Sequence, residues 1–233
     1  MNRPTTPGEK IALVQGFTLF SDLSYAACAA ILAVAQEKCF WRSQTMYVQG
    51  EPVEQVMMLL SGGVKIMQHG FNGDEVILRL IVKGEIVGGF PPRAEYTHRS
   101  TAQALESSSA LVWEVGAFRE LLDSFPVFQS NLVRVLEARL REIEQRFLEV
   151  CCEEVASRLS HELIRLTNRL SNDLRGNNKI FLSCRELAQM IGTTRATVSR
   201  LLCRWEKLGI VSVRGEGVEV RDFAALTRLA ANE

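Results

Sequence analysis

Residues 183–214 constrain this chain most, because their pattern predicts two short helices joined by a tight turn and followed by a strand. Gly192 supplies the turn, and Thr194 is placed to cap the second helix. The positions predicted to face the core are Leu187, Ala188, Ile191, Val198, Leu201, Leu202 and Trp205. Residues 210–213 and 218–220 predict short strands joined by a tip at 215–217. The segment therefore resembles a helix-turn-helix followed by a β-wing.

The opposite side of the second predicted helix carries side chains that suit a DNA major groove. Residues 183–214 contain six Lys or Arg against two Glu, a local charge of +4 in a chain that is formally neutral. Arginine can donate two hydrogen bonds to guanine O6 and N7, and hydroxyls can bind phosphates. The predicted DNA-binding residues are Thr194, Arg195, Thr197, Ser199, Arg200 and Arg204. For Thr194 and Thr197, capping or packing is an equal alternative, and for Arg204 a solvated side chain or a backbone contact.

The fold class predicted for the whole chain is α+β. Residues 1–10 are predicted to be a polar tail and 11–125 a sensor domain, in which 11–38 are helical. Between residues 39 and 115, short apolar runs alternate with Gly-containing turns, which indicates a barrel or jelly roll. The predicted strands are 46–48, 56–60, 64–67, 76–82, 102–105 and 110–115, with a hairpin at Asn72-Gly73. Residues 153–233 are predicted to form the DNA-binding domain, with a helix over 153–170 and a polar turn over 172–179.

A long helix is predicted over 126–152, with apolar residues spaced 3, 4, 3, 4 and 3 apart. Its predicted seam residues are Val133, Leu136, Leu140, Ile143, Phe147 and Val150. Because the other faces carry charges of both signs, we expect this seam to pair with a parallel copy in a homodimer. The alternative is a long helix that packs only on its own barrel.

The composition indicates an ordinary globular protein, with 47% hydrophobic and 23% charged residues. No apolar run approaches the about 18 residues of a membrane span, and no secretory signal is visible at the N-terminus. The six cysteines include no C-x-x-C pair. We therefore expect a reduced, cytoplasmic protein with no membrane partner.

The order of these segments resembles the cAMP-receptor-protein/FNR family of bacterial transcription regulators. The matching segments are LFSDLS at 19–24, QGEPVEQVMMLLSGGVKI at 49–66, GDEVILRLIVKGEIVGG at 73–89, RSTAQAL at 99–105 and the helix-turn-helix. The resemblance implies a cyclic-nucleotide-binding-like jelly roll, a dimerisation helix and a winged helix-turn-helix. It also implies a homodimer that binds a palindromic double-stranded DNA operator and RNA polymerase.

The expected effector pocket comprises Gly88, Gly89, Arg99 and Ser100. Cyclic-nucleotide members of the family place a Glu where Gly89 stands, to accept a hydrogen bond from the ribose. Ile143 and Glu144 stand near the positions of a hydroxyl pair that meets the adenine. The resemblance therefore implies a signal other than cAMP. Arg99 could still bind another anion, or it could form a surface ion pair.

The cofactor remains unknown from the sequence. Cys28 and Cys39 are expected on a helix and at its exit, with no further cysteines nearby, which disfavours an iron–sulfur cluster. Haem is an alternative, with His98 as its candidate ligand. Cys184 and Cys203 are candidate redox residues, although buried, inert thiols are the ordinary expectation.

In the family, an Arg-Glu pair and a later Arg contact the DNA half-site; here Arg195 and Arg200 are kept and Ala196 replaces the Glu. An enzyme is not expected, because there is no nucleophile–base pair, phosphate-binding Gly-Lys loop or metal-ligand spacing. The alternative function is a ligand-binding barrel protein, or a haem or redox sensor, whose main output is not DNA binding.

Overall fold

A helix begins at Pro7 in this computed structural model, which describes residues 6–70, 73–89, 96–171, 179–215 and 217–231. Helix α1 spans Pro7–Gln15, and a capping box fixes its start: Glu9 N–H donates to Thr6 Oγ1 over 3.3 Å and Thr6 N–H donates to Glu9 Oε2 over 2.7 Å. The prediction of a polar tail is therefore wrong for residues 7–10, while residues 1–5 lie outside the described part of the chain. The prediction was based on the polar composition of this segment and overlooked the Thr-x-x-Glu capping signal of Thr6 and Glu9.

The prediction of helix over 11–38 is also only partly correct. Helix α1 is followed by a 3₁₀ turn at Thr18–Phe20 and by α2 at Tyr25–Ala33, which Ser24 caps. The chain then enters strand β1 at Gln36–Phe40, which pairs antiparallel with a strand far along the sequence. This long-range pairing provides hydrogen-bond partners for the backbone of residues 36–40, and the local sequence does not predict it.

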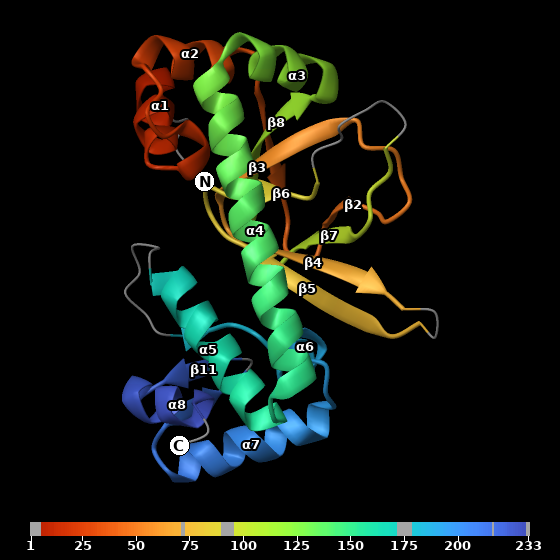
Figure 1. The fold of residues 1–233 in the computed structure, drawn as a ribbon, viewed down its shortest axis with the longest axis vertical. Helices are drawn as coiled ribbons and strands as arrows, with labels where there is room; N and C mark the ends of the chain where they lie inside the picture. The colour runs from red at the N-terminus through yellow and green to blue at the C-terminus, as the bar shows by residue number, and fades with distance from the viewer. Residues whose placement is uncertain (1–5, 71–72, 90–95, 172–178, 216, 232–233) are drawn as a thin grey trace. The chain divides into compact units, whose positions relative to one another are not determined.

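Two four-stranded antiparallel sheets form the predicted jelly-roll barrel (Figure 1). Their strand orders are β1-β8-β3-β6 and β2-β7-β4-β5. The strands other than β1 are β2 (Thr45–Tyr47), β3 (Gln55–Ser61), β4 (Val64–His69), β5 (Glu75–Ile81), β6 (Ile86–Val87), β7 (Thr101–Ala104) and β8 (Ser108–Glu114). The hairpin expected at Asn72-Gly73 lies partly outside the described residues, since Asn72 does.

Alternate residues of β3 enter two separate hydrophobic clusters. Met57 and Leu59 belong to the cluster inside the barrel, whereas Val56 and Met58 pack with the N-terminal helices and with α3 (Val115–Ser124). Successive side chains of a strand point to opposite faces. The unbroken apolar run of residues 56–60 is therefore a strand that is buried on both faces.

Helix α4 spans Pro126–Cys152, as predicted for the long helix. Its start is held by Phe128, which is fully buried against the rings of Phe20 and Phe118. Asn131 Nδ2 donates to the carbonyls of Leu19 and Ser21 over 3.1 and 2.7 Å. The N-terminal turns of α4 are thus fixed to the sensor domain.

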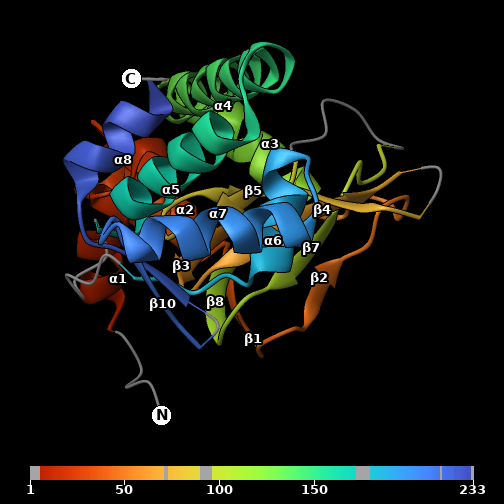
Figure 2. The ribbon, with the colours of Figure 1, turned by 90° about the horizontal axis from the view of Figure 1, so that it is seen from below.

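The described chain divides into two units, Met1–Gln68 with Arg79–Arg141 and His69–Leu78 with Glu142–Glu233. The second unit holds the predicted winged helix-turn-helix, and Figure 2 shows α7 lying across it with α6 alongside. Its elements after α4 are α5 (Val155–Ser171), β9 (Lys179–Ile180), α6 (Cys184–Ile191), α7 (Arg195–Lys207), β10 (Val211–Arg214), β11 (Gly217–Val220) and α8 (Phe223–Ala230). The polar turn expected over 172–179 lies, except for Lys179, outside the described residues.

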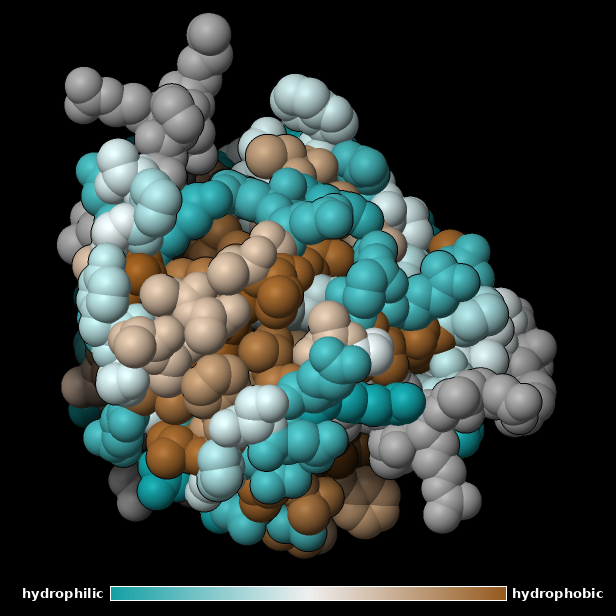
Figure 3. All heavy atoms as spheres, turned by 90° about the horizontal axis from the view of Figure 1, so that it is seen from above, coloured by the Kyte–Doolittle hydropathy of each residue, from teal (hydrophilic) through white to brown (hydrophobic). Residues whose placement is uncertain are grey.

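Helix α2 carries apolar residues on all sides, and part of its surface is exposed. The exposed residues are Tyr25, Ala26, Ala30, Ala33 and Val34, and Figure 3 shows apolar atoms gathered over this face of the molecule.

None of the helices in the described part of the chain is long and apolar enough to cross a membrane.

Candidate nucleic-acid interface and sensor pocket

Capping groups fix both helices of the helix-turn-helix. A capping box joins Ser183 and Glu186 at the start of α6, with backbone-to-side-chain distances of 3.2 and 3.0 Å. Gly192 ends α6 in the left-handed conformation, with φ of 65°. Thr194 then caps α7 by accepting a hydrogen bond from the Thr197 N–H over 3.2 Å. These contacts confirm the helix-turn-helix predicted from the sequence.

One side of α7 is buried against the rest of the second unit. Val198, Leu202 and Trp205 are buried, whereas Leu201 is only half-buried, so the prediction that it faces the core holds in part. The partners on α6 are the buried residues Leu187, Ala188, Met190 and Ile191. Burial of these apolar faces fixes which side of α7 is left to solvent.

The exposed side of α7 presents the predicted DNA-binding residues. Arg195 and Arg200 are exposed, and Arg204 is exposed one turn beyond them. The hydroxyls of Thr194 and Thr197 lie 2.9 Å apart, and Arg200 Nη2 lies 3.5 Å from Thr197 Oγ1. Ser199 is half-buried beside Arg200. The structure thus brings all six residues to one helix and its cap, and gives two of the hydroxyls a local partner.

The wing follows α7 directly. Strands β10 and β11 pair antiparallel, with Val211 opposite Val220 and Val213 opposite Val218, and β9 adds a third strand. Glu206 on α7 accepts a hydrogen bond from the Val213 N–H over 2.8 Å. The strand positions match the prediction for the wing, while Glu216 at its tip lies outside the described residues.

The two candidate redox cysteines differ in exposure. Cys184 is the first residue of α6 and is half-buried. Cys203 is exposed on α7, three residues beyond Arg200 and therefore on the same side of the helix. The expectation of a buried thiol is wrong for Cys203, because the apolar face of α7 runs through Leu202 and Trp205 instead.

The six predicted seam residues on α4 (Val133, Leu136, Leu140, Ile143, Phe147 and Val150) are exposed by between 40% and 68%. A helix that packed only on its own barrel would bury them. Their exposure along more than four helical turns leaves a continuous apolar face that no described residue covers.

Another side of α4 is anchored within the first unit. Arg139 Nη1 donates to the Gly88 carbonyl over 2.8 Å, and Nη2 donates to the Ile86 carbonyl. Both acceptors lie in the short β6 segment and the loop that follows it. Arg139 therefore connects α4 to the loop that carries the expected effector pocket.

Three arginines and three glutamates join α4 to α5 within the second unit. Arg165 holds the buried Glu149 with two bonds of 2.6 and 2.8 Å, Arg146 contacts the buried Glu162 at 3.0 Å, and Arg169 contacts Glu142 at 2.7 Å. Burial acts to lower the pKa of the Arg165 guanidinium, but its hydrogen bonds to the two buried carboxylates outweigh burial and raise it. These six residues form one cluster of ion pairs. The sequence showed their charges but not this pairing.

At the expected effector pocket, the Tyr47 hydroxyl fills the space beside Gly88. Gly88 has φ of 85°, and a Cβ there would lie 2.7 Å from the Tyr47 oxygen. Burial raises the pKa of Tyr47, while the nearby Ser100 side chain and the charges of Arg139 and Arg79 oppose that rise. The sequence analysis missed Tyr47, Arg79 and Arg139, because they come from three distant elements.

The other two expected pocket residues lie at the surface. Gly89 and Arg99 are both exposed, and the Arg99 guanidinium lies 5.9 Å from the centre of the Tyr96 ring. Glu85, the nearest acidic residue in sequence, contacts Arg79 at 3.3 Å. The structure therefore brings Gly88 and Ser100 together and leaves Gly89 and Arg99 outside that group.

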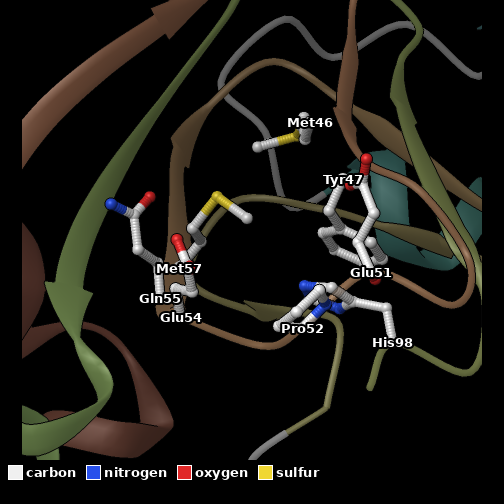
Figure 4. Close-up of a pocket in the computed structure, with 8 residues that line it drawn as sticks. All are labelled: Met46, Tyr47, Glu51, Pro52, Glu54, Gln55, Met57 and His98. Atoms are coloured by element: carbon white, nitrogen blue, oxygen red, sulfur yellow. The ribbon is translucent and has the colours of Figure 1, made fainter. Parts of the chain in front are cut away.

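The candidate cofactor ligands lie apart from one another. Cys28 is buried in α2, where burial raises its thiol pKa, and Cys39 is exposed on β1. His98 is buried and stacks on Tyr47, with ring centres 3.7 Å apart and planes within 7°. It lines a pocket of about 180 Å³ (Figure 4). Because sites for drug-sized molecules begin at about 300 Å³, a haem at His98 would need a larger cavity.

Comparison with known proteins matches two domain models to the chain. The model of the cyclic nucleotide-binding domain matches residues 37–125, and that of the Crp-like helix-turn-helix domain matches residues 157–229. The cyclic AMP receptor protein of Thermus thermophilus is 27% identical over 218 residues, which cover 93% of this chain and 98% of that protein. The CRP-like cAMP-activated global transcriptional regulator of Mycobacterium tuberculosis is 26% identical over 214 residues, covering 91% and 96%.

Among solved structures, FixK2 from Bradyrhizobium japonicum superposes with a TM-score of 0.74 at 23% identity, over 84% of this chain and 97% of that chain. A barrel of the cyclic-nucleotide-binding type, followed by a long helix and a winged helix-turn-helix, defines a class of sensor-coupled transcription regulators. The chain belongs to the cAMP-receptor-protein/FNR family of transcription regulators. Its relatives named here are regulators and not enzymes.

Proposed function

We propose that this protein is a homodimeric cytoplasmic transcription regulator that binds a palindromic DNA operator through α7 and acts on RNA polymerase. The observation that carries the proposal is the two-sided character of α7. Val198, Leu202 and Trp205 are buried, while Arg195 and Arg200 are exposed. A helix held in this way can enter the major groove with its arginines directed at base edges.

The base preference follows from the residues on the exposed side of α7. Arg195 and Arg200 each have the geometry to donate two hydrogen bonds to a guanine. Ala196 offers only a methyl group, which suits contact with thymine and cannot accept from cytosine. Thr194, Thr197, Ser199 and Arg204 are assigned to phosphate or backbone contacts. The half-site should therefore contain guanine, with a relaxed preference at the base pair that faces Ala196.

The exposed seam of α4 supports the dimer. Two copies pairing in parallel would cover the six apolar residues and would present two α7 helices to successive DNA half-sites, about 34 Å apart. In this proposal residues 11–125 are the sensor domain, 126–152 the dimerisation helix and 153–233 the DNA-binding domain.

Selection from random DNA duplexes, followed by a gel-shift assay, tests the proposal. We expect a palindrome to be enriched, and Arg200→Ala to weaken binding to it by about 1–3 kcal/mol and to relax the choice of base at one position in each half-site. Arg228→Ala, at an exposed position on α8, removes the same charge outside the interface and should change binding little. Failure to enrich any sequence would overturn the function, and would favour a barrel protein whose main output is not DNA binding. An equal loss on all sequences would assign Arg200 to a phosphate.

The signal is proposed to act on the loop that Arg139 holds. A ligand that displaced Tyr47 from beside Gly88 would compete with the bonds from Arg139 to the Gly88 and Ile86 carbonyls. The protein would then have two states, one with Arg139 bonded to these carbonyls and one with Arg139 released. A ligand that binds one state more tightly than the other shifts the equilibrium between them. cAMP is a poor candidate, because Gly89 offers no carboxylate to its ribose and Tyr47 fills the space beside Gly88.

Thiol oxidation is a second proposed input. Cys203 is exposed and lies one turn beyond Arg200, so an oxidised or modified sulfur would stand beside the DNA-contacting side chains. We expect hydrogen peroxide to inhibit operator binding by the unchanged protein and by Cys184→Ser. If Cys203→Ser kept its operator binding under the same treatment, Cys203 would be supported as the redox residue. The opposite pattern would assign the role to Cys184.

A further inference from the structure

One pocket of the barrel collects two thioethers and an imidazole around a small opening. The pocket lies between β2, β3 and the loop before β7, with a volume of about 180 Å³. Figure 4 shows the side chains of Met46 and Met57 directed into it, with the stacked rings of Tyr47 and His98 along another wall. Since a water molecule takes about 30 Å³ of liquid volume, the space suits a hydrated ion or a very small molecule.

The imidazole of His98 is held in place, but its ring makes no hydrogen bond with the described residues. Its backbone N–H donates to the Glu51 carbonyl and its carbonyl accepts from the Gly50 N–H, both over 2.8 Å. The ring stacks on Tyr47 and the residue is 8% exposed, yet the ring makes no hydrogen bond to any residue that the structure describes. Burial lowers the pKa of His98, while the charge of Glu51 opposes that shift. A neutral imidazole carries a lone pair on one ring nitrogen, which is the atom that binds metals.

The two thioethers come from neighbouring elements of the barrel. Met46 is half-buried on β2 and Met57 is buried on β3. Met58, the next residue, belongs to the hydrophobic cluster on the opposite face of the sheet. The alternation of the strand therefore assigns the Met57 sulfur, and not that of Met58, to the pocket.

Acidic residues complete the lining. Glu51 and Glu54 are exposed and favour a cation over an anion. The Gln55 amide is already used, since it accepts from Lys38 Nζ and donates to Glu114, both over 3.0 Å. Negative charge at the opening would raise the local concentration of any cation, and the inner donors would decide which cation is retained.

We propose that this pocket binds a soft monovalent metal ion, Cu(I), through Met46 Sδ, Met57 Sδ and a ring nitrogen of His98. Thioethers are poor ligands for Mg²⁺, Ca²⁺ or Mn²⁺, which prefer oxygen, and they select Cu(I) among the metals common in proteins. Methionine has three rotatable bonds, so both sulfurs can adjust to a central ion without movement of the strands. Neutral imidazole and thioether groups bind the ion without releasing a proton.

Silver(I), which has the same charge and softness and resists oxidation, is the probe for the experiment. The exposed cysteines compete for soft ions and are first alkylated with iodoacetamide; they are Cys39, Cys151, Cys152 and Cys203, with the half-buried Cys184. The chain has six methionines, so NMR of protein labelled with ¹³C at the methionine methyl groups gives one signal for each. We expect one equivalent of silver(I) to shift two of these signals, those lost in Met46→Leu and Met57→Leu.

Affinity measurements with matched variants complete the test. Removing a residue that only hydrogen-bonds to a metal ligand already lowers metal affinity by about 10–100-fold. The double variant Met46→Leu with Met57→Leu removes two direct ligands, so its affinity for silver(I) should fall by at least about 100-fold. His98→Phe, which keeps a ring to stack on Tyr47, should also weaken binding. Met58→Leu and Met67→Leu change thioethers outside the pocket and should bind silver(I) as the unchanged protein does.

Absence of silver(I) binding after alkylation would overturn the site, as would an equal loss of affinity in Met58→Leu and Met46→Leu. Copper(I) titrated anaerobically should follow the same order of variants. This test does not involve DNA, so its result is independent of the proposed function.

Discussion

Truncating Phe147 should weaken the dimer strongly. Fully burying a side chain of this kind is worth about 1.5–3 kcal/mol. Phe147 exposes 68% of its surface and would be covered once on each protomer, so the pair contributes about 2–4 kcal/mol to association. We therefore expect Phe147→Ala to raise the dimer dissociation constant by a factor of about 30–700. Sedimentation equilibrium over a range of protein concentrations measures this constant directly.

The neighbouring residue provides the control. Leu148 is also exposed, by 56%, but it lies outside the 3–4 spacing of the seam. Leu148→Ala should leave the dissociation constant within about twofold, because a residue outside the seam adds little to a parallel pair. If both variants weakened the dimer equally, or if neither did, the assignment of the seam to these six residues would be refuted.

Three further predictions test other parts of the molecule. Adding cAMP at millimolar concentration should not raise operator affinity in a fluorescence anisotropy titration, because Gly89 provides no ribose acceptor. Glu162→Gln should lower the free energy of unfolding by about 1.5–3 kcal/mol in urea, because it weakens the charge-assisted contacts that Arg146 and Arg165 make with the buried Glu162, whereas the exposed Glu154→Gln should change it little. Burial lowers the pKa of His98 in the folded protein, so the unfolded chain binds this proton more readily, and stability should fall as the pH drops below the ordinary histidine value of about 6.5. Urea midpoints between pH 7.5 and 5 should fall less steeply for His98→Asn than for the unchanged protein, while His69→Asn, at a half-exposed side chain, should keep the full slope.

The helix-turn-helix could be predicted in detail because local chemistry determines it. A Ser-x-x-Glu capping box, a glycine in the left-handed region and a threonine cap each act within a few residues. The long helix was also predictable from local sequence, since its apolar spacing repeats over 133–150. The tail was misassigned because its Thr6 cap was overlooked, although the signal was present in the sequence.

The sensor pocket could not be predicted in this way. Tyr47, Arg79 and Arg139 come from β2, β5 and α4, and only the closure of the barrel brings them around Gly88. The family resemblance placed Gly89 where cyclic-nucleotide members have a carboxylate, but it could not show that the Tyr47 hydroxyl fills the space beside Gly88. The placement of Arg99 at the surface likewise depends on tertiary structure.

In the heptad repeat of α4, the residues proposed to pair with a second copy differ in position from the arginines that bond to the rest of the same chain. The seam residues occupy two positions of the repeat, whereas Arg139 and Arg146, seven residues apart, occupy a third and share one side of the helix. Arg139 bonds the loop carbonyls of the first unit, and Arg146 contacts Glu162 within the second. A signal that released Arg139 would therefore act on α4 without removing any seam contact. We therefore expect the proposed dimer to keep its seam contacts with and without the signal, which would change how α4 is held and not how it pairs.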